Sequence, residues 1–223
     1  SLVGSEMCIR DRHRDPIWDN FGKIRVINED IISPNSGFST HSHSNMEIVT
    51  IVIKGEITHR DSLNNLGIIC EDEVQVMSAG TGISHSEKNE KNIDCKLFQI
   101  WIYPDVQNLK PSYNQMSIKN ISGNNLIIDS FKKNNSLLCI NQEISIWRCK
   151  YNRLNEKYLP SEIKNFNWIQ IIEGNLLIRD KNNKSNKYLS SGDGLGFEIS
   201  DFSDIDIESD TEVDLLLFSM PNI

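Results

Sequence analysis

The chain has 223 residues, of which 38% are hydrophobic and 24% charged, a composition typical of a globular protein with one large or two small domains. Its net charge of -8 argues against nucleic acid as a direct ligand, because phosphate binding requires clustered Lys and Arg side chains. The longest apolar runs, such as 48–53 and 215–218, are far shorter than the roughly 20 residues of a membrane span, so we expect no membrane insertion.

Residues 1–12, "SLVGSEMCIRDR", join no periodic pattern downstream and lack the apolar middle of a secretory signal. They resemble translated sequencing-adapter read-through, so we interpret them as a non-native leader. The natural start would then be missing, and the true sequence would begin near His13, to which we assign no role.

The remaining chain alternates short apolar runs with clusters of Gly, Asn, Asp and Ser, which is the pattern of β-strands separated by turns. In chain order the main runs are "KIRVI", "MEIVTIVIKGEITHRD", "GIICEDEVQVMSAGTG", "KLFQIWIYP", "NLLIRD", "DIDIES" and "VDLLLF". Only 154–166 has a weak helical pattern. The sequence therefore predicts an all-β fold.

An internal echo indicates duplication. The stretches "IVIKGEITHRDS" (51–62) and "QIIEGNLLIRDK" (170–181) share the order strand, charged residue, Gly, strand and Arg-Asp, at an offset of 119. Likewise "EDEVQVMSAG" (71–80) and "SGDGLGFEIS" (191–200) both place acidic turn residues ahead of a strand. Two similar units predict two β-barrels joined by a polar link.

The cysteines predict a reducing compartment. They are odd in number, scattered and never spaced as C-x-x-C, at Cys8, Cys70, Cys95, Cys139 and Cys149. We therefore expect free thiols in a cytoplasmic protein, and neither a disulfide scaffold nor a zinc ribbon.

The histidines are candidates for metal binding. All five precede residue 86, and His41 and His43 in "THSH" would share one face of a strand. In "SAGTGISHSEKN", His85 and Glu87 repeat that spacing behind two glycines that permit a sharp turn. Three imidazoles and one carboxylate suit a divalent transition metal, first Fe(II), with Ni, Mn, Co, Cu or Zn as alternatives. No thiolate accompanies them, which argues against a structural zinc.

The stretches "GFSTHSHSNMEIVTIVIKGEITHRDSLNN" and "VQVMSAGTGISHSE" resemble the pirin family of the cupin superfamily, particularly its bacterial quercetin 2,3-dioxygenase-like branch. The likeness runs from "IRVINEDII" to "LLLFSMP" and implies a bicupin, two double-stranded β-helix (jelly-roll) barrels in one chain. We expect a metal-binding N-terminal domain at 13–112, a linker at 113–123 and a C-terminal domain without metal at 124–223. Family members carry additional N-terminal strands, which the leader replaces here.

The resemblance implies that the metal ligands are His41, His43, His85 and Glu87, with Glu87 also a candidate general base. Glu47 continues the parity of the first pair, and we expect it near the site but not as a ligand. Family members usually have Pro where this chain has Ser42, a change at an outward position. An offset of 119 from the two strand histidines reaches Pro160 and Glu162, so we expect no second metal site.

Two functions remain open. The resemblance implies a dioxygenase that opens a flavonol ring with O₂ and releases CO, acting on a small aromatic substrate as a monomer. The alternative is a metal-responsive regulatory protein that docks on a protein partner. His59, in "THRDS", is interpreted as a turn residue hydrogen-bonded to its neighbours.

Overall fold

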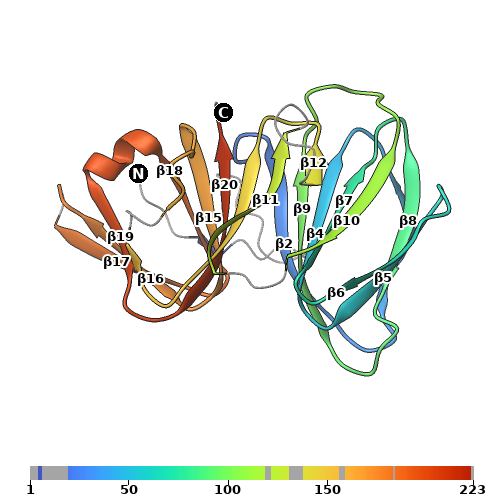
Figure 1. Ribbon diagram of the computed structural model, residues 1–223, viewed down its shortest axis with the longest axis horizontal. Coiled ribbons are helices and arrows are strands. Elements are labelled where there is room, and N and C mark those ends of the chain that lie inside the picture. Colours follow the sequence, from blue (N-terminus) through green and yellow to red (C-terminus); the bar gives the residue numbers. More distant parts are fainter. Residues whose placement is uncertain are drawn as a thin grey trace. The chain divides into compact units, whose positions relative to one another are not determined.

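The computed structural model describes residues 5–6, 20–118, 122–130, 138–155, 159–182 and 184–221. These residues form β-strands joined by turns, with one short 3-10 helix at Ile199–Ser203 and no α-helix in the ranges given (Figure 1). The predicted all-β class is therefore confirmed. No helix in the described ranges is long and apolar enough to cross a membrane.

The chain separates into two compact units. One, here called the N-terminal barrel, comprises Ile9–Lys119 with Ser130–Gln142. The other, the C-terminal barrel, comprises Ser1–Cys8, Asn120–Asp129 and Glu143–Ile223. Each contains a larger and a smaller antiparallel sheet, as the prediction of two β-barrels requires.

The N-terminal barrel packs a five-stranded sheet against a four-stranded one. The first has the order β10 (Ser112–Ser117), β7 (Glu73–Ser78), β4 (Glu47–Lys54), β9 (Cys95–Ile102) and β2 (Ile24–Ile32). The second has the order β3 (Gly37–His43), β8 (Ile83–Lys88), β5 (Glu56–Asp61) and β6 (Leu66–Cys70). One buried cluster draws side chains from both sheets: Ile32, Val52, Ile57, Ile69, Cys95 and Leu97. Burial of this apolar surface holds the two sheets together.

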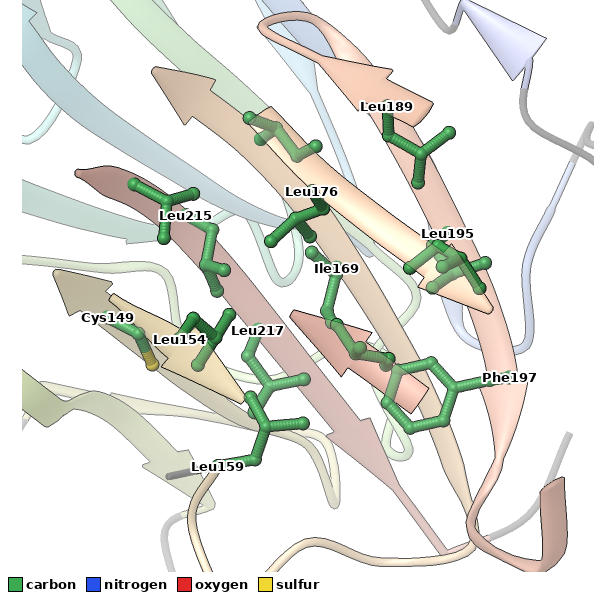
Figure 2. Packing of buried hydrophobic residues seen from close by; sticks show 14 of the residues in the cluster. Cys149, Leu154, Leu159, Ile169, Leu176, Leu189, Leu195, Phe197, Leu215 and Leu217 are labelled. Atoms are coloured by element: carbon green, nitrogen blue, oxygen red, sulfur yellow. The ribbon is translucent and has the colours of Figure 1, made fainter. Parts of the chain in front are cut away.

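The C-terminal barrel repeats this plan. Its larger sheet includes, in order, β1 (Ser5–Glu6), β18 (Asp193–Glu198), β15 (Phe166–Glu173), β20 (Val213–Met220), β13 (Ser145–Tyr151) and β11 (Gly123–Ser130). The smaller has the order β14 (Leu154–Asn155), β19 (Ile205–Ser209), β16 (Asn175–Asp180) and β17 (Ser185–Ser190). Figure 2 shows leucines from both sheets packed in one core with Ile169 and Phe197 of the larger sheet.

The sequence echo corresponds to matching strands. The hairpin of β4 and β5 is the counterpart of β15 and β16, and each turns at a glycine with positive φ, Gly55 at 78° and Gly174 at 91°. The second echo coincides with β7 and β18, each paired with its first hairpin strand. Both predicted repeats are therefore confirmed as equivalent elements of the two barrels.

Three other expectations from the sequence are not confirmed. The helical pattern at 154–166 is wrong where the chain is described, because Leu154–Asn155 form β14 and no helix follows. The leader lies outside the described residues except for 5–6, which pair as β1 with β18. The domain boundaries stay predictions, although β10 occupies 112–117 at the start of the expected linker.

Gly174→Ala tests the turn that both barrels share. A Cβ at this position would run into the backbone oxygen of Glu212 and lie 3.0 Å from Cα of Val213, in addition to the cost of a positive φ. Gly123→Ala is the matched control, since Gly123 also has a positive φ but nothing lies within 4 Å of its added Cβ. We expect the control to lower the free energy of unfolding by about 1 kcal/mol and Gly174→Ala by clearly more, measured by urea denaturation. Equal losses would contradict the steric account.

Candidate metal centre

Three histidines meet on the inner face of the smaller N-terminal sheet. His41 and His85 are direct cross-strand partners in the β3–β8 pair, and His43 lies on the same face of β3 two residues further on. The ring centroids are 4.7 Å apart for His41 and His43, 4.5 Å for His41 and His85, and 5.1 Å for His43 and His85. One nitrogen from each ring lies within 4.8 Å of the others, a spacing at which the three can converge on one ion.

Burial keeps two of these rings neutral. The pKa of His43 is lowered to about 4, first by desolvation and then by the charges of His41 and Arg25. Desolvation, followed by the neighbouring histidines, lowers the pKa of His85 to about 3. Both rings therefore offer lone pairs at neutral pH. Neither nitrogen of the buried His85 has a hydrogen-bond partner among the described residues, which fits a metal ligand.

Glu87 is fully buried on the same face of β8 as His85. Its Oε1 accepts hydrogen bonds from Thr50 at 3.3 Å and Gln75 at 3.2 Å, and its Oε2 accepts one from Gln99 at 2.7 Å. Burial raises the pKa of Glu87 despite the opposing effects of His59 and these hydrogen bonds. Its carboxylate oxygen groups with His59 and His85 within 4.8 Å, and not with His41 and His43.

His59 is the residue of this site that the sequence interpretation missed. It does hydrogen-bond its neighbour Asp61, with Nε2 3.2 Å from Oδ2, but it lies within β5 and its side chain is fully buried. It is the cross-strand partner of Glu87, and its ring stacks on Tyr113 at 4.7 Å. The available signal was its two-residue spacing from Ile57 and Asp61, which places it on the inward face.

Glu47 is not brought to the histidines. The chain breaks its strand alternation at Asn45, which has a φ of 49°, and Glu47 then begins β4 in the other sheet. Glu47 and Thr50 are three residues apart and project from opposite faces, and it is Thr50 that reaches Glu87. The Glu47 carboxylate accepts hydrogen bonds from Ser78 at 2.7 Å and from Asn141 at 3.1 and 3.2 Å.

The outer end of the site is lined by aromatic and apolar side chains. The indole of Trp101 stands edge-on to His43 with centroids 4.9 Å apart, and Arg25 lies over its ring. A cluster next to it comprises Met46, Ile48, Met77, Ala79 and Ile83. A surface pocket of about 310 Å³, at the small end of the range for ligand pockets, is lined by Ser42, His43, Ser44, Ser62, Gly82, Ile83 and Ser84.

The C-terminal barrel has isoleucines at the corresponding positions. In the β5–β8 pair Asp61 faces His85 and His59 faces Glu87, whereas in the β16–β19 pair Asp180 faces Ile205 and Ile178 faces Ile207. Ile178, Ile205 and Ile207 belong to the buried apolar core. β14 is the counterpart of β3, and Pro160 and Glu162 lie beyond its end in a stretch that forms no strand.

Titration tests whether the half-buried ring of His43 and the buried ring of His85 are neutral. At about pH 5 an ordinary histidine is mostly protonated, but His43 and His85 should stay neutral in the metal-free folded protein because their pKa values are lowered. Ring ¹⁵N chemical shifts measure this directly, and the urea-unfolded chain is the control. Since the unfolded chain binds these protons first, acid below pH 6.5 lowers the free energy of unfolding through these groups. Titration near 6.5 in the folded state would contradict the burial account.

Comparisons with known proteins agree with this arrangement of two barrels. A family model described as Pirin matches residues 9–102, and a model described as Quercetinase C-terminal cupin domain matches residues 127–220. Quercetin 2,3-dioxygenase of Escherichia coli strain K12 is 34% identical over 210 residues, which cover 94% of this chain and 87% of that protein.

Two solved structures are also similar along the whole chain. The crystal structure of YhhW from Escherichia coli has a TM-score of 0.82 at 31% identity and covers 100% of this chain and 92% of that one. The bacterial pirin YhhW in complex with nickel(II) has a TM-score of 0.81 at 31% identity, with coverage of 100% and 93%. The chain therefore belongs to the pirin family of the cupin superfamily, in its bacterial quercetin 2,3-dioxygenase-like branch.

Proposed function

We propose that the chain is a metal-dependent dioxygenase that opens the ring of a flavonol such as quercetin with O₂ and releases CO. The observation that carries this proposal is the convergence of His41, His43 and His85 in a chain 34% identical to a quercetin 2,3-dioxygenase. Neither buried nitrogen of His85 has another partner among the described residues. No disulfide links the four described cysteines, which supports a cytoplasmic location.

The ligands proposed for one divalent metal are His41, His43, His85 and Glu87. Three neutral imidazoles and one carboxylate suit Fe(II) and also Ni, Mn, Co, Cu or Zn, and a relative of known structure binds nickel(II). With a divalent ion this set has a net charge of about +1, which favours an anionic ligand such as a deprotonated flavonol. When bound, the metal would supply Lewis acidity that lowers the pKa of a substrate hydroxyl.

The chain's own residues would supply the base and the surroundings. Burial raises the pKa of Glu87, which makes its carboxylate a stronger proton acceptor for the substrate hydroxyl. Thr50, Gln75 and Gln99 hold that carboxylate in place by hydrogen bonds. The indole of Trp101 offers an apolar wall beside His43 for an aromatic ring.

His41→Ala and Glu87→Ala test the ligand set. We expect each to weaken metal binding by at least about 100-fold, so that less than stoichiometric metal remains after dialysis, measured by mass spectrometry of the metal. Ser42→Ala is the matched control. Ser42 lies between the two strand histidines and bonds Ser84 on the opposite face of the strand, so it should keep its metal. Retention of metal by both ligand variants would show that the ligand assignment is incorrect.

Oxygen uptake tests the reaction. Protein loaded with Fe(II), and in parallel with each alternative metal, should consume O₂ and release CO when quercetin is added. His43→Ala should remove this activity because it removes a proposed metal ligand, whereas Ser42→Ala should retain it. A chain that holds one tightly bound metal and consumes no O₂ with any of these ions would refute the dioxygenase and favour the regulatory alternative.

A further inference from the structure

Two sets of metal donors lie side by side in the N-terminal barrel and share His85. The outer set is His41, His43 and His85, and the inner set is His59, His85 and Glu87. Within each set the donor atoms lie within 4.8 Å of one another. The inner set is buried throughout, with His59 and Glu87 at 0% exposed and His85 at 1%.

The hydrogen bonds of Asp61 determine which nitrogen of His59 carries a proton. The Asp61 carboxylate accepts the backbone N–H groups of Leu63 and Asn65 and the side-chain amide of Asn65. It is therefore an acceptor towards His59 as well, and Nε2 of His59 donates to it. The proton of the neutral ring is thus on Nε2, and Nδ1 carries a lone pair.

The inner set then brings together three buried lone-pair donors: Nδ1 of His59, the unprotonated nitrogen of His85 and the Glu87 carboxylate. Nδ1 of His59 and both nitrogens of His85 are buried and have no hydrogen-bond partner among the described residues. The Glu87 carboxylate is an acceptor for Thr50, Gln75 and Gln99. The single N–H of a neutral His85 can satisfy only one of these neighbours, whereas a cation between them would bind all three lone-pair donors.

The supporting contacts are those typical of a metal ligand shell. Asp61 fixes the tautomer of His59, and stacking on Tyr113 fixes its plane. Amide and hydroxyl donors hold the Glu87 carboxylate by hydrogen bonds. Ligating histidines and carboxylates are commonly held by such outer partners, whose removal costs about 10- to 100-fold in metal affinity.

We propose that His59, His85 and Glu87 form an inner binding position for a divalent transition-metal cation, beside the position of the three outer histidines. Two imidazoles and one carboxylate suit Zn²⁺, Co²⁺ or Fe²⁺. Since His85 and Glu87 also belong to the proposed catalytic set, the inner position is a second resting place for an ion in the same centre. His59 is the donor that distinguishes it.

The double variant His41→Ala/His43→Ala isolates the inner position. Titrated with CoCl₂ and followed by the visible bands of Co²⁺ and by calorimetry, it should bind about one Co²⁺ per chain, more weakly than the wild type. Adding His59→Phe, which keeps a ring between His85 and Tyr113 but has no donor atom, should abolish this binding. Circular dichroism of each variant verifies that the barrel is folded.

Asp61→Asn tests whether His59 acts as a metal ligand through Nδ1, while the packing of its ring is left in place. Asparagine keeps an oxygen for the turn N–H groups but offers an N–H to Nε2, so the proton of His59 moves to Nδ1. We expect Co²⁺ affinity of the double variant to fall by at least about 10-fold. Arg60→Ala is the matched control, because Arg60 is the neighbouring residue and its ion pair with Glu90 is half-exposed; it should leave Co²⁺ binding unchanged.

A folded double variant that binds no Co²⁺ would overturn the inner position, and the proposed function would stand if the wild type still binds its metal. Co²⁺ binding that survives His59→Phe would also overturn it, because the ion would then lie elsewhere. Should the double variant not fold, anomalous diffraction from wild-type crystals soaked in CoCl₂ decides. A peak between His59, His85 and Glu87 supports the proposal, and a peak confined to the outer histidines refutes it.

Discussion

The site depends on a single strand that is hydrogen-bonded on both sides. β8 pairs with β3 along one edge and with β5 along the other, so His85 and Glu87 each have a neighbour from both flanking strands. Through this pairing His85 lies between His41 and Asp61, and Glu87 lies next to His59. A sheet with a fixed register therefore collects, from three distant parts of the chain, polar groups that burial would otherwise disfavour.

Much of the fold was predictable because its determinants are local. Strands followed from apolar alternation, and the two barrels followed from the repeated strand, glycine and Arg-Asp order. The convergence of His41, His43 and His85 was predicted partly from two-residue spacing and partly from family resemblance. Their role as ligands, and that of Glu87, stays a prediction.

The remaining features depend on strand register and tertiary contacts, which no short stretch of sequence determines. Sequence spacing shows that His59 and Asp61 share a face, but the register of β5 against β8 decides that this face meets Glu87. Glu47 follows the parity of the histidines only if the strand is regular, and the positive φ of Asn45 ends that regularity. The weak helical pattern at 154–166 does not produce a helix at Leu154–Asn155, because these residues pair as β14 with β19 and such tertiary contacts override a weak local helical preference.

The buried isoleucines of the C-terminal barrel bear on which part of the chain a bound metal would stabilise. Ile178, Ile205 and Ile207 fill the places of a histidine, a second histidine and a carboxylate with hydrocarbon, so burial of apolar surface stabilises this barrel at those three positions. An ion that binds only the folded N-terminal barrel adds its binding free energy to the stability of that barrel. Changes in the concentration of free metal would thus change the stability of the N-terminal barrel, where the proposed ligands lie.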